Sequence, residues 1–242
     1  MTTKLLYQDD AYAESCATVI AGKDEAGRVI LDSTVFYPTG GGQPGDRGWL
    51  ETANGSSIDV VTTRKGAEPG SVLHELQDPE TAPEVGTEVT ARIDWALRHR
   101  HMRMHTALHL LSVAVPFPVT GGQIGDGSGR LDFDIDRALP PADDITSHLM
   151  ELVDADHLVT ATWISDEELD ARPDLVKTMA VAPPRGTGKV RLIRIGDIDL
   201  QPCGGTHVRS TSEIGAIAVE KIQSKGARNK RIRIAFQDAP TG

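Results

Sequence analysis

The spacing of apolar residues along this 242-residue chain changes from that of strands to that of a helix at Asp94. Before Asp94, β-branched and apolar residues come in short runs, with turn signals such as Asn54-Gly55 between them. After it, apolar residues recur at helical spacing as far as Pro116. The chain therefore has to fold as a β-rich part followed by a part that begins with a long helix.

The short apolar runs predict strands at residues 17–20, 28–31, 49–52, 58–62, 71–73 and 89–93. Many short strands at close spacing are typical of a small barrel or sandwich. Residues 78–83 show no periodicity and predict a surface loop. We therefore expect an N-terminal small β-barrel domain over residues 1–94.

Residues 95–242 predict an α+β domain that begins with a helix at 95–114. Asp94 suits the N-cap position, and the helical stripe consists of Leu97, Met104, Leu108, Leu111 and Val115. Further strands are predicted at 129–135, 159–164, 190–195, 216–220 and 230–235, and helices at 141–157 and 166–169. Residues 172–189, rich in proline and glycine, predict a mobile loop. The last three strands are expected to close an antiparallel sheet packed by helices, so the fold class is α+β.

The composition, 39% hydrophobic and 25% charged, is that of a soluble globular protein. No run approaches the roughly 20 apolar residues of a membrane span, and the N-terminus turns acidic where a signal peptide would be apolar. We therefore expect a cytoplasmic protein without membrane partners, in which Cys16 and Cys203 stay thiols. The formal net charge is −10, yet residues 177–242 hold 12 basic and 5 acidic side chains. A polyanion could dock there, although a solvated face of mixed charge is the alternative.

Two histidines on the predicted helix, His105 and His109, are four residues apart and can reach one metal ion. Far downstream, Cys203 and His207 flank two glycines, which let the backbone turn tightly so that both side chains converge. Three imidazoles and one thiolate suit Zn²⁺. A closed four-ligand site leaves no position for water, so a structural and a catalytic role both remain open.

Two neighbouring positions on the helix limit the interpretation of this metal site. His101 lies one further turn back and drifts off the ligand face, so we expect it at the surface. Zinc peptidases place a glutamate directly after the first helical histidine, and Thr106 stands there instead. A peptidase is therefore disfavoured.

The segment Phe36–Asp46 contains three consecutive glycines between two predicted strands. Glycines allow backbone amides to approach a ligand, and Thr39 and Gln43 add a hydroxyl and an amide at the edges. A tight turn without a ligand is the alternative. A second glycine-rich stretch, 121–127, carries Gln123 and predicts a loop that leads into the next strand.

A basic edge with no acidic residue runs from 221 to 233. Its side chains are Lys221, Lys225, Arg228, Lys230, Arg231 and Arg233. Such an edge can contact phosphates, or it can simply face solvent.

Together these motifs resemble the alanyl-tRNA editing proteins (the AlaX type, medium-length form), which are related to the editing domain of alanyl-tRNA synthetase. The motifs are FYPTGGGQPGDRG (36–48), HTALHLL (105–111), RLDFDI (130–135), QPCGGTHV (201–208) and SKGARNKRIRI (224–234). The resemblance runs over nearly the whole chain. The order of the HTALH and CGGTH motifs after a GGGQ loop makes it specific.

The resemblance implies a zinc-dependent aminoacyl-tRNA hydrolase that deacylates mischarged Ser-tRNA(Ala), and possibly Gly-tRNA(Ala), in trans. It implies a zinc site of His105, His109, Cys203 and His207, and it matches Thr39 to the position that recognises the seryl hydroxyl. Further expected substrate contacts are Gly41, Gly42, Gln43 and Gln123, and expected tRNA contacts are Lys221, Lys225, Arg228, Lys230 and Arg231. No carboxylate in the motifs is an obvious general base, so the catalytic groups stay unassigned. The alternative is a non-catalytic, zinc-stabilised tRNA- or RNA-binding module.

Overall fold

The computed structural model describes residues 2–176 and 188–237. It divides into two compact units, Met1–His99 and Arg100–Gly242. The division falls inside helix α1 (Trp95–Ala114), a few residues after the change in apolar spacing. Among the described residues, no helix is both long and apolar enough to cross a membrane.

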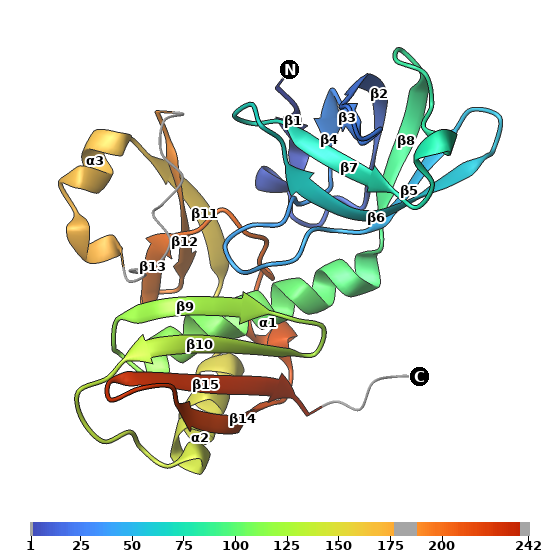
Figure 1. The fold of residues 1–242 in the computed structure, drawn as a ribbon. Helices are drawn as coiled ribbons and strands as arrows, with labels where there is room; N and C mark the ends of the chain where they lie inside the picture. Colours follow the sequence, from blue (N-terminus) through green and yellow to red (C-terminus); the bar gives the residue numbers. More distant parts are fainter. Residues whose placement is uncertain (1, 177–187, 238–242) are drawn as a thin grey trace. The chain divides into compact units, whose positions relative to one another are not determined.

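The first unit contains a closed barrel of six antiparallel strands, paired in the order β2-β3-β7-β6-β5-β8 (Figure 1). The strands are β2 (Ser15–Lys23), β3 (Val29–Leu31), β5 (Gly48–Thr52), β6 (Ser57–Lys65), β7 (Val72–Leu76) and β8 (Glu88–Ile93). Each overlaps one predicted run, so the predicted barrel is confirmed. Closure pairs every strand on both sides and leaves the barrel without an open edge.

Alternation along the strands builds the barrel core. On β8, Val89, Ala91 and Ile93 are buried while the residues between them are only partly buried. They pack with buried residues of the other strands, among them Ile20, Leu31, Leu50, Val60 and Leu76. The remaining elements of this unit are β1 (Lys4–Leu5), which pairs in parallel with β4 (Ser33–Thr34), and two short 3₁₀ turns, Leu6–Gln8 and Pro79–Thr81.

Helix α1 has the predicted bounds, and Asp94 caps it by accepting a hydrogen bond from the Leu97 amide at 3.0 Å. The expectation that His101 lies at the surface was wrong, because its exposure is 3%. The residues around it, including Met102, Met104 and Thr106, are fully buried. Between His101 and Ser112 every residue of the helix except Arg103 is buried, so helical drift does not turn His101 to solvent.

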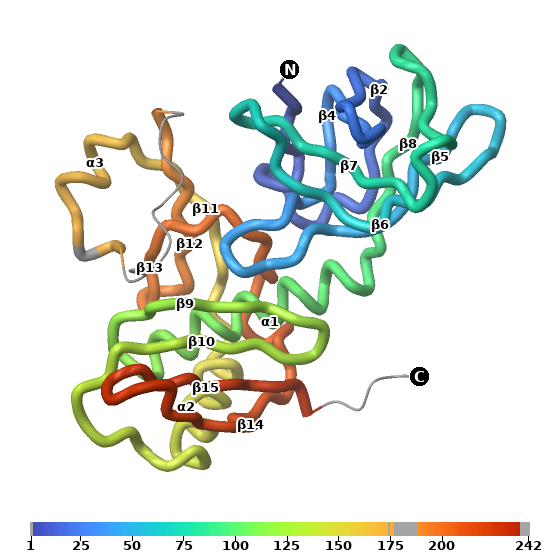
Figure 2. The backbone as a smooth tube through the Cα atoms, in the orientation of Figure 1, coloured from blue at the N-terminus to red at the C-terminus, as the bar shows by residue number. Residues whose placement is uncertain are grey.

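The second unit holds two antiparallel sheets, which the tube drawing separates clearly (Figure 2). The first sheet has the order β14-β15-β10-β9 and consists of β9 (Val119–Ile124), β10 (Ser128–Asp134), β14 (Ile217–Ser224) and β15 (Asn229–Phe236). The second has the order β11-β12-β13 and consists of β11 (Val159–Ile164), β12 (Val190–Ile195) and β13 (Asp199–Pro202).

Two predictions about these sheets were wrong. The strand at 190–195 does not join the two C-terminal strands, because it pairs with β11 and β13 instead. The stretch 121–127 is not simply a loop, because 121–124 belong to β9 and pair with β10. The apolar pattern of a segment predicts that it forms a strand. Which other strand it pairs with depends on contacts between residues that are distant in sequence.

Helices cover one face of the larger sheet. Buried Gly129 of β10 lies directly against Met104 and Leu108 of α1. Helix α2 (Ala142–Asp154) packs on β14, where Thr146 Oγ1 accepts a hydrogen bond from the Val219 amide at 3.0 Å. The helix is shorter than the predicted 141–157.

The remaining elements lie between strands. Helix α3 (Asp166–Asp170) and the 3₁₀ turn Pro173–Leu175 lie between β11 and β12 of the smaller sheet, and the 3₁₀ turn Thr211–Ile214 lies between β13 and β14. Most of the predicted mobile loop at 172–189 lies outside the described residues.

Candidate metal centre and glycine loop

Four side chains of the second unit converge on one point. His105 and His109 lie one turn apart on α1, and Cys203 and His207 lie on the loop that follows β13. Their potential ligand atoms all lie within 4.8 Å of one another. The structure therefore brings together the four residues that the sequence proposed as metal ligands.

The geometry fits a tetrahedral ion. Cys203 Sγ lies 3.5 Å from His105 Nε2 and 3.2 Å from His207 Nε2. Zinc bonds of about 2.3 Å to sulfur and about 2.0–2.1 Å to nitrogen, at tetrahedral angles, separate such atoms by about 3.6 Å. The donor set and its close spacing therefore suit a divalent metal ion.

Buried partners orient two of the imidazoles. Thr106 Oγ1 lies 3.1 Å from His207 Nδ1, which leaves His207 Nε2 to face the centre. Asp199 Oδ2 lies 3.1 Å from His109 Nδ1, and Gln201 Nε2 donates a 2.8 Å hydrogen bond to the same carboxylate oxygen. A carboxylate behind a metal-binding histidine fixes its tautomer and raises its basicity.

Buried Arg191 holds the backbone of the cysteine loop. Its Nη1 donates hydrogen bonds to the carbonyls of Cys203, at 3.2 Å, and Gly205, at 2.8 Å. The Gly205 amide in turn donates to Cys203 Sγ at 3.4 Å. These contacts fix the direction in which Cys203 Sγ points, and the Gly205 amide stabilises a negative charge on the sulfur.

The electrostatics favour a thiolate at this point. Burial alone would raise the pKa of Cys203, but the charges of His105 and His207 reverse this effect and hold it well below its usual range. Burial would likewise lower the pKa of His109, whereas its hydrogen bonds with Asp199 and Cys203 raise it to about 9. Burial and the charge of His105 keep the pKa of His207 well below 6.5. A metal ion needs the thiolate that this site already favours.

The glycine loop belongs to the first unit, between β4 and β5. Thr39 is exposed; its Oγ1 donates to the Thr63 carbonyl at 3.1 Å and accepts from the Gly45 amide at 2.9 Å. Gly41 and Gly42 are exposed and have φ of 57° and 82°, which only glycine adopts readily. Gln43 is buried, with 1% exposure.

The other predicted contact residues lie on the larger sheet of the second unit. Gln123, on β9, is exposed and accepts a 3.3 Å hydrogen bond from Arg130. Two of the predicted tRNA contacts are held by carboxylates of β10: Arg228 binds both oxygens of Asp134, and Arg231 both oxygens of Asp132. Lys230 donates to Ser224 at 2.9 Å, and Lys221 and Lys225 are exposed.

Sequence reasoning missed the residues that orient the ligands. Asp199 and Gln201 alternate on β13, so both point to the same face, toward His109. Their position a few residues before the cysteine motif was the available signal. Arg191 gave no such signal, because a single arginine in an apolar strand has many roles.

Two family models match the chain. The model for the threonyl and alanyl tRNA synthetase second additional domain matches residues 190–233, which include Cys203 and His207. The model for class II (A) tRNA synthetases matches residues 4–97, which include the barrel and the glycine loop.

Curated relatives match over nearly the full length. An alanyl-tRNA editing protein AlaX-M of Methanosarcina mazei is 32% identical over 99% of both chains. The AlaX-M protein of Pyrococcus horikoshii is 35% identical over 97% of both. An alanine–tRNA ligase of Pyrobaculum neutrophilum is 34% identical over 91% of this chain, which corresponds to 25% of the ligase. With this similarity along its whole length, the chain belongs to the alanyl-tRNA editing protein family.

Proposed function

We propose that this protein is a zinc-dependent aminoacyl-tRNA deacylase that hydrolyses the ester of mischarged Ser-tRNA(Ala), with Gly-tRNA(Ala) as a second candidate substrate. The observation that carries the proposal is the buried group of three histidines and a cysteine, in a chain that belongs to the alanyl-tRNA editing proteins. The names of its relatives, which refer to alanyl-tRNA, support the substrate class. The two free thiols and a tRNA substrate fit a cytoplasmic location.

Accurate attachment of alanine to its tRNA benefits from a second site that hydrolyses wrongly attached amino acids. A pocket that accepts alanine cannot exclude the smaller glycine by size, and it rejects serine, with one added hydroxyl, only weakly. The editing site must therefore recognise the serine hydroxyl while sparing alanine.

Thr39 has one hydrogen-bonding position left for this task. A hydroxyl has one donor and two acceptor positions. The donor serves the Thr63 carbonyl, and one acceptor position takes the Gly45 amide. The remaining lone pair can accept a hydrogen bond from a seryl hydroxyl, which alanine lacks.

His105, His109, Cys203 and His207 would hold the zinc ion. A bound zinc ion can polarise an ester carbonyl, activate water or anchor the substrate. Thr106 and Asp199 keep two imidazoles turned toward the ion. Gly41, Gly42, Gln43 and Gln123 are proposed as further substrate contacts, and Lys221, Lys225, Arg228, Lys230 and Arg231 as tRNA contacts. Exposed Lys221 and Lys225 are the two with the greatest freedom to meet a phosphate.

A single-turnover deacylation assay tests the function. Purified protein of measured zinc content is mixed with Ser-tRNA(Ala), Gly-tRNA(Ala) and Ala-tRNA(Ala) separately. We expect rapid loss of serine with alanine retained, and the glycyl ester shows whether Gly-tRNA(Ala) is hydrolysed as well. Zinc-loaded protein that hydrolyses none of the three would instead support the alternative, a non-catalytic RNA-binding module.

The role of Thr39 needs its own variants. Thr39→Val should reduce the preference for serine over alanine by about tenfold, the size of one lost hydrogen bond. Thr39→Ser keeps the hydroxyl and should retain the preference. Equal selectivity in Thr39→Val and wild type would remove Thr39 from serine recognition.

A further inference from the structure

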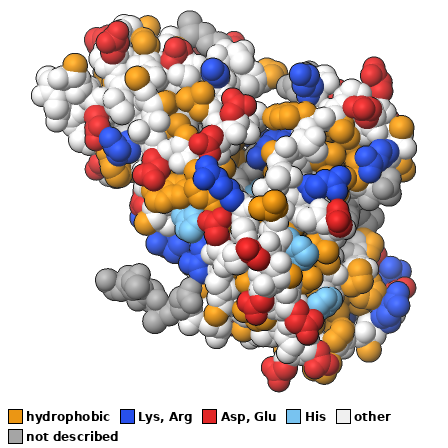
Figure 3. Space-filling model, turned by 180° about the vertical axis from the view of Figure 1, so that it is seen from behind, with side chains coloured by type: hydrophobic (Ala, Val, Ile, Leu, Met, Phe, Trp, Pro, Cys, Tyr) orange, Lys and Arg blue, Asp and Glu red, His pale blue; other side chains and the backbone are white. Residues whose placement is uncertain are grey.

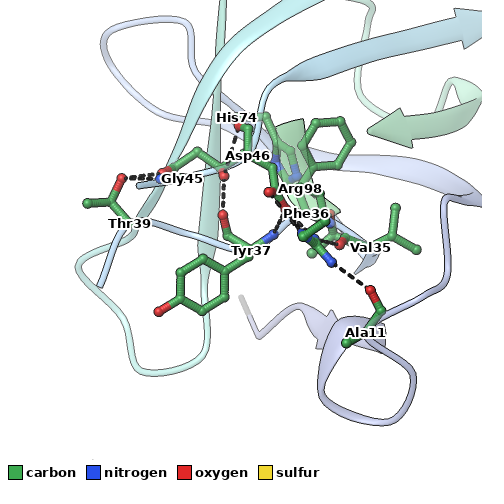
Figure 4. Close-up of polar contacts among 11 residues, drawn as sticks. Ala11, Val35, Phe36, Tyr37, Thr39, Gly45, Asp46, His74 and Arg98 are labelled. Carbon is green, nitrogen blue, oxygen red and sulfur yellow. Dashed lines mark hydrogen bonds and ion pairs between the residues drawn. The ribbon is translucent and has the colours of Figure 1, made fainter. Parts of the chain in front are cut away.

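Arg98 and Asp46 form a buried ion pair beneath the glycine loop. Their side chains are 0% and 2% exposed. Arg98 Nε lies 2.9 Å from both carboxylate oxygens of Asp46, and its Nη2 contacts Oδ2 as well. The same guanidinium donates to the carbonyls of Ala11, at 3.1 Å, and Val35, at 2.6 Å. The arginine therefore ties the end of the glycine loop to two other segments of the first unit (Figure 4).

Asp46 also closes the base of the loop. Its carboxylate accepts the Tyr37 amide at 2.6 Å, and its own amide donates to the Tyr37 carbonyl at 2.9 Å. Thr63 Oγ1 of β6 donates to that carbonyl at 2.6 Å. Tyr37 and Asp46, near the two ends of the loop, are thus held against each other (Figure 4), and Thr63 ties them to β6.

Thr39 depends on this closed base. It reaches the Thr63 carbonyl with both its backbone amide, at 2.9 Å, and its hydroxyl. Gly45, which donates to the Thr39 hydroxyl, directly precedes Asp46. The glycines of the loop have no side chains to pack, so contacts at its base and across it determine where the Thr39 hydroxyl points.

A buried ion pair is weak evidence for stability, since apolar residues of similar volume often serve a fold as well. Its advantage is directional, because a bidentate guanidinium fixes a carboxylate in position and angle. The neighbouring ion pair Arg47–Asp94 differs in both respects. Its side chains are 55% and 26% exposed, and among the described residues the two side chains make no hydrogen bond to Tyr37, Asp46 or Thr63.

We propose that Arg98 and Asp46 are positioning residues for substrate discrimination, which act through the loop base to hold the Thr39 hydroxyl where it meets the serine side chain. This inference rests on the proposed function, because it needs an ester that is selected by its hydroxyl. The two residues do not touch the substrate. Their role is to reduce the freedom of Thr39.

The test measures the ratio of kcat/KM for Ser-tRNA(Ala) to that for Ala-tRNA(Ala) in zinc-loaded, full-length protein. Asp46→Asn keeps the shape but removes the charge that Arg98 holds, and it should lower the ratio by about tenfold. In a Thr39→Val background it should lower the ratio no further, because both changes remove the same recognition. Arg47→Ala, on the exposed pair beside it, should leave the ratio at the wild-type value.

Thr63→Val provides a second, milder probe, since Asp46→Asn leaves Arg98 buried without its counter-charge and can fail to fold. It removes only the hydroxyl at the loop base and keeps the backbone carbonyl that Thr39 uses. It should also lower the ratio, and Thr63→Ser should restore it.

Two failures are distinguishable. Wild-type protein that hydrolyses neither ester would overturn the proposed function, and the inference with it. A selective wild type whose Asp46→Asn and Thr63→Val variants lose both activities in parallel, at unchanged ratio, would overturn the inference alone. If Asp46→Asn does not fold, the ratio of Thr63→Val decides.

Discussion

Asp199 places a carboxylate in the interior of the second unit, 4% exposed and within hydrogen-bonding distance of His109. Such a charge is costly to bury unless it is paired. Its partners include His109, a candidate ligand, and the amide of Gln201. Its position is therefore explained by what it does to His109.

Asp199→Asn should weaken zinc binding by about 10- to 100-fold, because it replaces the charged partner of a metal-binding imidazole by a neutral one. Competition against a chromophoric chelator measures the affinity. Asp197→Asn, two residues away with a fully exposed carboxylate, is the matched control and should bind zinc as the wild type does. Equal affinities for both variants would show that Asp199 does not tune the site.

His74 makes the stability of the barrel depend on pH. It is fully buried, with Nε2 2.9 Å from Thr34 Oγ1 and Nδ1 3.1 Å from the Val29 carbonyl. Burial lowers its pKa from 6.5 to about 4. The unfolded chain takes up a proton below about pH 6.5, whereas the folded barrel does so only near pH 4. The stability from this residue is therefore complete above pH 6.5 and is lost as the pH falls.

Between pH 7 and pH 4, protonation of this histidine should lower the free energy of unfolding of the wild-type protein by about 3 kcal/mol, at about 1.4 kcal/mol for each unit of pKa shift. Urea unfolding followed at several pH values measures the loss. His74→Gln removes the titrating group and should show a shallower decline. His148→Gln, at an exposed position on α2, should retain the wild-type slope. Parallel curves for wild type and His74→Gln would contradict this assignment.

At the scale of elements, α1 is the central piece of the second unit. It carries two candidate ligands and also supports the larger sheet through Gly129 of β10. A Cβ at Gly129 would lie 2.8 Å from Met104 Sδ and 3.2 Å from Leu108 Cδ1. The helix and strand therefore approach as closely as they do because this position has no side chain.

Gly129→Ala should destabilise the protein by about 1–3 kcal/mol through overpacking, since Met104 is fully buried and cannot move into solvent. Gly121→Ala on neighbouring β9 is the control, because its Cβ would lie 3.5 Å or more from any neighbour. Chemical unfolding of the two variants compares them. If both variants lost the same free energy of unfolding, α1 and β10 could move apart at little cost to make room for the added methyl group.

At the scale of the whole molecule, the candidate metal centre joins parts that lie far apart in sequence. It links α1 to the loop after β13, and all four candidate ligands lie in the second unit. A metal ion that binds only the folded chain stabilises the part that holds its ligands.

Removal of zinc with a chelator should lower the melting temperature and should act locally. Hydrogen exchange should speed up in residues 100–114 and 199–208, while the barrel strands β2 to β8 keep their protection. Addition of zinc should reverse both effects. Uniform loss of protection in both units would show that the centre stabilises more than the unit that contains it.

The local elements and the candidate metal ligands could be predicted from the sequence. The strands of the barrel, α1 and most strands of the second unit follow from the spacing of apolar residues, which is a local property. The metal ligands were predictable because HTALH and CGGTH place their side chains at spacings that chemistry restricts.

The contacts between distant segments could be found only in the folded chain. The structure assigns β12 to the smaller sheet, buries His101, and places Asp199 behind His109 and Arg98 behind Asp46. In the sequence these residues are ordinary charged or polar positions, separated by 90 residues in one case and 52 in the other. Their roles arise from burial, which makes each partner necessary, and burial depends on how the whole chain packs.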